Sequence, residues 1–103
     1  MTGAGDSKQN RSVRIFGGEG GHTDDVNCSI FSPDALMVFT GSNDKKIKIW
    51  DVGKGRKITE LAGHDAAITA MAISSDGRYF ASGDMSGAVL LWEISYGERP
   101  QKI

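Results

Sequence analysis

The chain has 103 residues, of which 39% are hydrophobic, and its formal net charge at pH 7 is −1. A chain of this length forms one small domain at most, and its 12 Lys and Arg against 13 Asp and Glu leave no excess of positive charge. Because binding to a nucleic-acid backbone needs a positive surface, this composition argues against a nucleic-acid partner. The single cysteine, Cys28, excludes an internal disulfide framework.

Residues 1–11 are polar, contain glycine and show no hydrophobic period, so we predict a disordered N-terminal lead-in. They lack the apolar stretch of a secretory signal. The apolar run at residues 35–39 is too short to cross a bilayer. Together with the lone cysteine, these features favour an intracellular protein, cytoplasmic or nuclear, with no membrane partner.

Residues 12–103 form the predicted folded region, which consists of short β-type runs separated by turn residues. An isolated strand is predicted first, at 12–16. Four further strands are predicted at 25–31, 36–41, 46–51 and 57–61. Within residues 46–51, Ile47 and Ile49 alternate with Lys46 and Lys48, which is typical of a strand with one apolar and one polar face.

The rest of the chain follows the same order. Strands are predicted at 67–73, 78–83, 88–93 and 99–103. Asp76-Gly77, between the first two, is a strong hairpin turn signal. Since no segment sustains a 3.6-residue period, no helix is predicted and the fold class is all-β.

The two halves are copies of each other, displaced by 42 residues without a gap. His22 recurs as His64, and Trp50 recurs as Trp92. Repeat one spans residues 21–62 and repeat two spans residues 63–103. A repeat of this kind is one supersecondary unit that cannot bury its own apolar face alone.

The repeated residues resemble those of the WD-repeat family of β-propellers. Repeat one contains Gly-His, Phe-Ser-Pro-Asp and Thr-Gly-Ser-Asn-Asp-Lys-Lys-Ile-Lys-Ile-Trp-Asp, and repeat two contains Gly-His, Ile-Ser-Ser-Asp-Gly and Ser-Gly-Asp-Met-Ser-Gly-Ala-Val-Leu-Leu-Trp-Glu. In this family each blade is a four-stranded antiparallel sheet, and blades pack around a channel. The resemblance therefore implies two blades plus one leading strand, which is an incomplete propeller.

The resemblance also implies a buried hydrogen-bonded tetrad in each blade. In repeat one its members would be His22, Thr40 (or Ser42), Asp44 and Trp50. Asp44 can accept from one ring nitrogen of the histidine, and the hydroxyl can join the other ring nitrogen to the indole N–H.

Repeat two departs from this pattern. His64, Ser82 and Trp92 match, but Ser86 stands where repeat one has Asp44, and Asp84 lies two residues early. We therefore expect the carboxylate link to be lost or re-routed, and the second blade to be weaker.

Other chemistry for the same residues is disfavoured. A hydroxyl, a histidine and an aspartate also make a hydrolase triad, but recurrence in both repeats, each time with a tryptophan, favours a structural role. No Cys or carboxylate joins the two histidines at metal-ligand spacing, and Cys28 is interpreted as a small core residue. We expect no enzyme activity, no metal and no cofactor.

Propeller geometry places two loops of each repeat on one rim. The loops are residues 20–25 and 42–45 in repeat one, and residues 63–66 and 84–87 in repeat two. The candidate partner-binding residues on this rim are Asp24, Asp25, Asn43, Asp65 and Met85. Three carboxylates suggest a basic peptide or patch as partner, while solvated loops are an equally good interpretation of any one residue.

Two blades are fewer than the four to eight of usual propellers, so their outer faces need cover. Further blades could come from a longer chain, from copies of this chain or from a partner. We expect a non-catalytic protein-interaction scaffold that is a fragment or short form of a longer propeller protein. The alternative is a self-assembling two-blade propeller that binds a small ligand such as a sugar; it needs exposed aromatic rings, for which only Tyr79 and Tyr96 remain.

Overall fold

A computed structural model describes residues 16, 20–95 and 100–103. The predicted lead-in, residues 1–11, lies outside the described residues. So does the predicted leading strand at 12–16, apart from Phe16. The Phe16 ring packs against Trp50, with the two ring centroids 5.4 Å apart.

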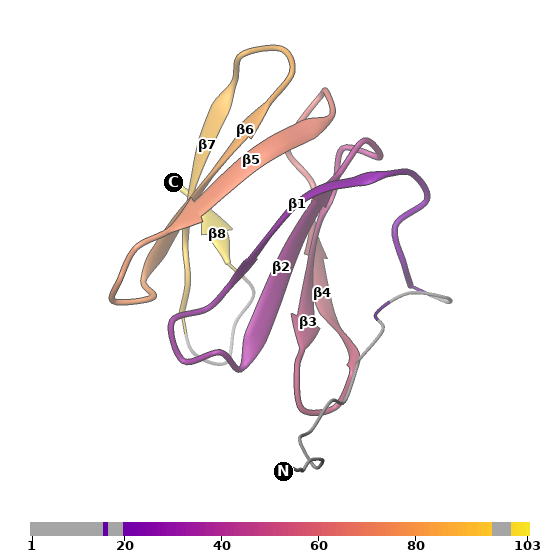
Figure 1. The fold of residues 1–103 in the computed structure, drawn as a ribbon. Coiled ribbons are helices and arrows are strands. Elements are labelled where there is room, and N and C mark those ends of the chain that lie inside the picture. Colours follow the sequence, from indigo (N-terminus) through magenta and orange to yellow (C-terminus); the bar gives the residue numbers. More distant parts are fainter. Residues whose placement is uncertain (1–15, 17–19, 96–99) are drawn as a thin grey trace, which may run out of the picture.

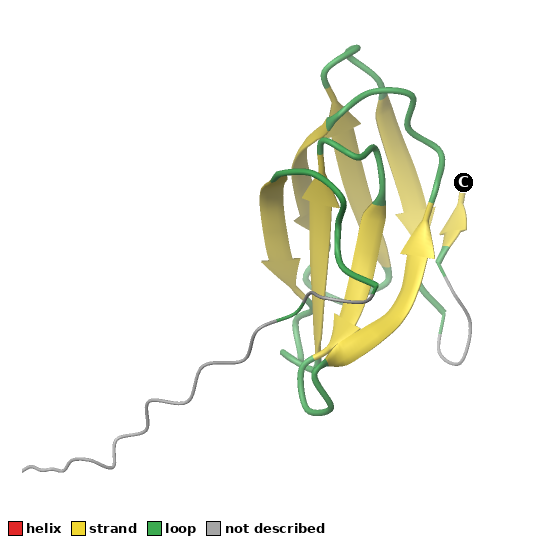
Figure 2. Ribbon diagram, turned by 90° about the vertical axis from the view of Figure 1, so that its right-hand side faces the viewer, coloured by secondary structure: helices red, strands yellow, loops and turns green. Residues whose placement is uncertain are grey.

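Within the described residues, eight strands form two antiparallel sheets that pack against each other (Figures 1 and 2). The first sheet has the order β1-β2-β3-β4 and the second has the order β5-β6-β7-β8. The strands are β1 (Val26–Phe31), β2 (Met37–Ser42), β3 (Ile47–Asp51), β4 (Arg56–Leu61), β5 (Ile68–Ile73), β6 (Tyr79–Asp84), β7 (Val89–Glu93) and β8 (Gln101–Lys102). The predicted all-β fold of two four-stranded antiparallel sheets is confirmed, and the described part of the chain contains no helix.

Equivalent turns close the first hairpin of each sheet in the same way. In the first sheet Asp34 accepts hydrogen bonds from the Ser32 hydroxyl and from the backbone N–H of Leu36. In the second sheet Asp76 accepts from the Ser74 hydroxyl and from the backbone N–H of residue 78. Because short polar side chains satisfy the turn amides locally, each turn is specified by its own sequence.

The core lies between the two sheets. It consists of seven buried residues: Phe39, Ile47, Ile49, Leu61, Ile68, Phe80 and Trp92. At its centre Phe39 of β2 meets Phe80 of β6 edge-on, with centroids 4.9 Å apart, and Phe80 stacks on Trp92 at 5.7 Å. Full burial of a side chain of this size stabilises the folded chain by about 1.5–3 kcal/mol.

Close approach of the sheets depends on Gly41 in β2. A Cβ atom at this position would lie 2.6 Å from the Cγ2 atom of Ile68 and 2.9 Å from the Sγ atom of Cys28. Neither distance is possible for real side chains, so glycine is what allows Ile68 of the second sheet to pack directly onto the backbone of the first.

The same register positions are buried in the first sheet and exposed in the second. We call the face of a sheet that points toward the next sheet along the chain its trailing face. On the first trailing face Ile47, Ile49 and Leu61 are 0%, 2% and 3% exposed. Their counterparts 42 residues later are Val89, Leu91 and Ile103, and these are 72%, 45% and 67% exposed. The second sheet therefore leaves in water a face that its repeat partner buries.

This arrangement predicts opposite tolerances for two equivalent glycines. Gly41→Ala should lower the free energy of unfolding by about 1–3 kcal/mol, because the methyl group collides with Ile68. Gly83→Ala, at the matching position of β6, should be tolerated, because its nearest neighbour is the backbone oxygen of Ala88 at 3.8 Å. Denaturant unfolding of both variants tests this, and equal effects would contradict the packing described.

Candidate functional site

The polar residues of repeat one meet at one end of the first sheet. The Nδ1 atom of His22 lies 2.9 Å from the Oδ2 atom of Asp44, and its Nε2 atom lies 2.7 Å from the Oγ1 atom of Thr40. The indole N–H of Trp50 donates to the same Thr40 oxygen at 2.9 Å. Because an ionised carboxylate only accepts, His22 carries its proton on Nδ1, and Nε2 accepts from the Thr40 hydroxyl.

Asp44 is held as a carboxylate by its donors. Burial by itself raises its pKa, but hydrogen bonds from His22 and from the backbone N–H groups of Lys46 and Thr23 outweigh burial and lower the pKa below its usual value. The side chains of His22 and Asp44 are only 4% and 7% exposed. Ser42, the other candidate for the hydroxyl, instead accepts from the backbone N–H of Asp44 at 3.0 Å and is fully buried.

The second sheet contains an equivalent cluster. The Nδ1 atom of His64 lies 2.7 Å from the Oδ2 atom of Asp84, and its Nε2 atom lies 2.6 Å from the Oγ atom of Ser82. The indole N–H of Trp92 donates to Ser82 at 2.9 Å. The side chains of His64 and Asp84 are each 1% exposed, so this cluster is the more deeply buried of the two.

The carboxylate link of repeat two is therefore re-routed through Asp84 and not lost. The expectation that the second blade is the weaker one stays a prediction. Asp84 occupies the register position of Ser42, and Ser86 occupies that of Asp44, so the two side chains are exchanged between the repeats. Ser86 donates its hydroxyl and its backbone N–H to the Oδ1 atom of Asp84. These donors, together with His64, keep the pKa of Asp84 far below its usual range.

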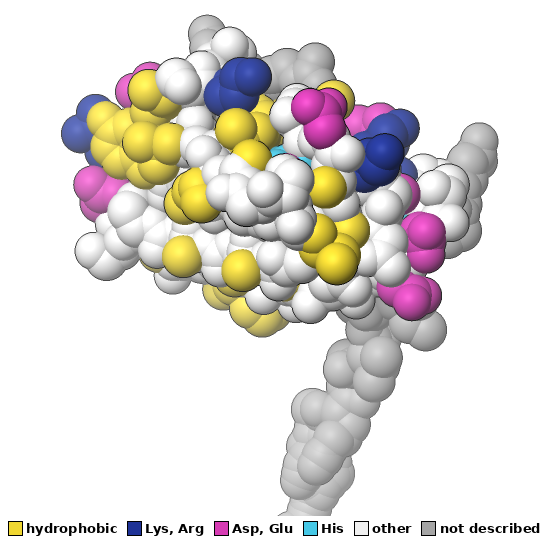
Figure 3. Space-filling model, turned by 90° about the horizontal axis from the view of Figure 1, so that it is seen from above, with side chains coloured by type: hydrophobic (Ala, Val, Ile, Leu, Met, Phe, Trp, Pro, Cys, Tyr) yellow, Lys and Arg dark blue, Asp and Glu magenta, His cyan; other side chains and the backbone are white. Residues whose placement is uncertain are grey.

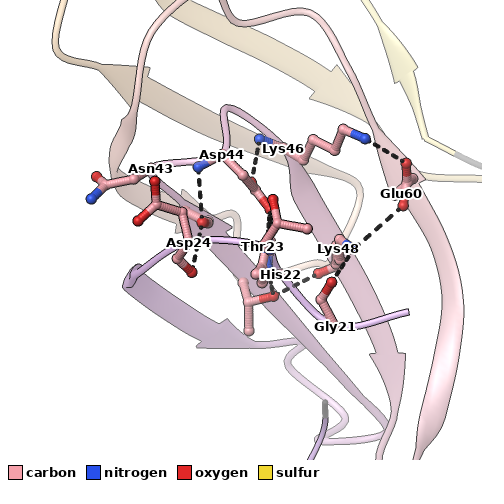
Figure 4. Close-up of polar contacts among 12 residues, drawn as sticks. Gly21, His22, Thr23, Asp24, Asn43, Asp44, Lys46, Lys48 and Glu60 are labelled. Carbon is pink, nitrogen blue, oxygen red and sulfur yellow. Dashed lines mark hydrogen bonds and ion pairs between the residues drawn. The ribbon is translucent and has the colours of Figure 1, made fainter. Parts of the chain in front are cut away.

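Lys48 is a buried lysine next to the first cluster that the sequence did not identify as part of the site. Lys48 alternates with apolar residues and was expected on a polar face, yet its side chain is 6% exposed. Its ammonium group donates to the backbone oxygens of Gly20 and Gly21, each at 2.8 Å, and lies 3.6 Å from Glu60 (Figure 4). Lys48 thus holds in place the segment that precedes His22. The sequence did contain one signal of this burial, because repeat two has a leucine, Leu90, at the position of Lys48.

Three lysine side chains surround Glu60 of β4. Glu60 accepts from Lys57 at 2.8 Å. It also accepts from Lys46 at 3.3 Å and faces Lys48 (Figure 4). The hydrogen bond from Lys57 is the main cause that lowers the pKa of Glu60 to about 2. This carboxylate therefore stays charged and compensates the buried ammonium of Lys48.

The clusters have the pairings of a catalytic triad, but the hydroxyl of each is also bonded to a tryptophan. Each histidine joins a hydroxyl to a carboxylate, as in hydrolases. However, Thr40 and Ser82 also accept an indole N–H, and Ser82 is 1% exposed. The geometry supports packing of the sheets, with every polar atom of the cluster partnered.

The rim residues lie at the same end of both sheets. Asp24, Asp25, Asp65 and Met85 are exposed, with Met85 74% exposed, and Asn43 is partly buried. Asn43 accepts a hydrogen bond from Asn27, which also donates to the backbone oxygen of Ile68 across the two sheets. Figure 3 looks down on this rim and shows acidic and basic side chains interspersed with hydrophobic ones.

Cys28 packs at the edge of the core, and burial raises the pKa of its thiol. Among the described residues there is no group of three His, Cys, Asp or Glu side chains that could hold a metal ion. A search of the same part of the chain finds no helix long and apolar enough to cross a membrane.

Comparison with known proteins decides the family. The sequence profile of the WD40 family, described as "WD domain, G-beta repeat", matches residues 10–51 and 55–93. The chain belongs to the WD40 repeat family. The two sheets are accordingly WD40 blades, and the suspected resemblance is confirmed.

Three curated relatives illustrate this membership. The U3 small nucleolar RNA-interacting protein 2 of Mus musculus is 39% identical over 84 residues, which covers 71% of this chain and 18% of the relative. The small ribosomal subunit protein RACK1y of Oryza sativa subsp. japonica is 36% identical over 85 residues (81% and 25%). The transcription initiation factor TFIID subunit 5 of Caenorhabditis elegans is 34% identical over 84 residues (82% and 12%).

Solved structures give the same result. "Structure of U3-55K" and "Crystal structure of RRP9 WD40 repeats" each match with a TM-score of 0.74 and 36% identity, over 81% of this chain and 26% of theirs. The chain thus spans about a quarter or less of the proteins it matches. One relative is named for an interaction with RNA, so the exclusion of a nucleic-acid partner drawn from composition is not confirmed.

The exchanged aspartate and serine predict how the second cluster responds to mutation. Ser86→Asp should destabilise the chain by about 1–3 kcal/mol, because it removes a donor to Asp84 and adds a like charge beside it. Asp84→Ser should also destabilise, since His64 loses its acceptor. The double variant, which gives repeat two the order of repeat one, should recover most of the loss. A double-mutant cycle by denaturant unfolding measures this, and strict additivity would contradict it.

Proposed function

We propose that this chain supplies two adjacent blades of a WD40 propeller and acts as a non-catalytic scaffold for protein–protein interaction. The exposed trailing face of the second blade carries this proposal. Val89, Leu91 and Ile103 occupy the positions that are buried between the two blades of this chain. A face of this kind is suited to a further blade, because soluble monomers rarely leave large contiguous apolar patches in water.

The engagement of the polar side chains in the two clusters supports a scaffold rather than an enzyme. The histidines, aspartates and hydroxyls with reactive potential are engaged with each other in both clusters. The blades instead expose loops that are anchored by strands, and binding residues usually lie on such loops. We assign the tetrad residues a structural role and the rim residues the binding role.

The names of relatives support a partner that is a protein inside the cell. One is a ribosomal subunit protein, one is a subunit of a transcription factor, and one, of Pyricularia oryzae, is an MST50-interacting protein. The rim of this chain offers Asp24, Asp25 and Asp65, so a basic patch on the partner fits it. Lys45 lies on the same rim, and its positive charge reduces the acidic character of the rim without reversing it.

The sugar-binding alternative finds little support. Trp50 and Trp92 are each 3% exposed and serve the core. The ring of Tyr79 has the guanidinium group of Arg78 over it, 5.5 Å from the centroid. Tyr96 lies outside the described residues.

The open face predicts concentration-dependent association of the purified chain. Light scattering should show species larger than a monomer, and Leu91→Lys should reduce them, because a charge at this face opposes apolar contact. Ser75→Lys, in an exposed turn away from this face, serves as the control and should leave association unchanged. A compact monomer with slow hydrogen exchange would contradict the proposal.

The rim predicts which proteins stay bound in affinity capture. Partner proteins should be lost when Asp24→Lys and Asp65→Lys are combined, since the rim charge is reversed, and retained in Lys54→Glu at the opposite end. Nuclease treatment of the lysate separates the alternatives. Capture that survives nuclease supports a protein partner, whereas capture that vanishes with RNA assigns the chain to an RNA-bound assembly.

A further inference from the structure

A groove separates the two sheets at the end opposite to the rim. The sheets contact each other along their inner strands, where β1 and β2 meet β5. The space between them at this end is a groove of about 940 Å³. Pockets that bind small ligands have volumes of roughly 300–1,000 Å³.

The floor and walls of the groove are apolar. Met37 and Ile94 are partly exposed and line the groove, while Phe39 and Ile49 lie beneath them in the core, 0% and 2% exposed. At the mouth, Leu36 is 65% exposed and Ile58 is 51% exposed. These aliphatic side chains give the mouth of the groove an apolar surface that an incoming apolar side chain can contact.

A β-bulge directs Ile58 to this place. In the pairing of β3 with β4, Ile49 faces Thr59 and Trp50 faces Lys57, so Ile58 is the extra residue between them. Bulges re-aim side chains and are frequent beside functional sites. The exposure of Ile58 is therefore built into the register of the outer strand.

The border of the groove is acidic. Among the described residues, Asp34, Asp51 and Asp76 line it, together with one cation, Arg78. Asp34 and Asp76 come from the equivalent hairpin turns, where their hydrogen bonds with Ser32 and Ser74 lower their pKa values. Both carboxylates are thus ionised at neutral pH and fixed in position on the two sides of the groove.

We propose that this groove binds an extended peptide segment of a partner protein in which bulky aliphatic side chains are flanked by Lys or Arg. The aliphatic side chains would pack on Met37 and Ile94, between Leu36 and Ile58. The flanking cations would meet Asp34 and Asp76. Because the groove lies between the two blades of this chain, further blades on either open face leave it in place. The site is independent of the rim and goes beyond the proposed function.

The test uses two libraries of fluorescent hexapeptides and the 103-residue chain. In the first library two positions carry Lys or Arg and two carry Leu, Ile or Phe; in the second the cations are replaced by Asp or Glu. Fluorescence anisotropy should show at least about tenfold tighter binding of the basic library, with a loss of affinity at high salt. Equal binding of the two libraries, or no binding of the basic one, would overturn the proposal.

Two groove variants and matched controls locate the binding. Asp34→Asn combined with Asp76→Asn removes both charges but keeps the Oδ1 acceptors of the turns, and it should weaken binding of the basic library about tenfold. Ile58→Thr should also weaken it, whereas Val26→Thr, which alters an aliphatic side chain of equal exposure (52%) outside the groove, should not.

The rim variant separates this proposal from the proposed function. Binding of the basic library that survives in Asp24→Lys with Asp65→Lys, but fails in the groove variants, supports the groove. Binding that fails in the rim variant and survives in the groove variants would overturn the groove and leave the rim as the peptide site. Circular dichroism of each variant confirms that the sheets are retained.

Discussion

The packing of Ile68 onto the backbone of Gly41 sets the distance between the two sheets. With that distance fixed, Phe39 can meet Phe80 edge-on and Phe80 can stack on Trp92. Protein interiors are packed as tightly as organic crystals, so a single methyl group at this point would shift the whole interface. The sheets contact each other along β1, β2 and β5, and the groove lies between them at the end opposite to the rim.

The two polar clusters show how one physical requirement is met by different residue orders. Each histidine needs a carboxylate on Nδ1 and a hydroxyl on Nε2, because a buried polar atom without a partner is costly. Asp44 meets the first need from the turn in repeat one, and Asp84 meets it from the end of β6 in repeat two. The aspartate and a serine two residues away have exchanged positions between the repeats, and in each repeat the serine is hydrogen-bonded to the aspartate. The two repeats therefore share the hydrogen-bonding groups around the histidine, although the carboxylate comes from different positions of the repeat.

The distribution of exposed apolar residues gives the two blades unequal roles. The first blade has its trailing face covered, while the second presents Val89, Leu91 and Ile103 to solvent. The WD40 relatives are four or more times longer than the matched region, which is consistent with further blades in those proteins. The rim and the groove lie at opposite ends of the sheets, so both remain open in an assembly of more blades.

The sequence by itself determined the repeat, the all-β class and the strand positions, because turn residues and hydrophobic alternation are local signals. It also pointed to His22, Asp44 and Trp50, since these recur with the family pattern. Tertiary structure alone decided that Asp84 serves His64, that Lys48 is buried against Gly20 and Gly21, and that a bulge exposes Ile58. These outcomes depend on which atoms come within hydrogen-bond distance when the two sheets are packed together. Apart from Leu90, which stands at the position of Lys48 in repeat two, no pattern of residue types contains that information.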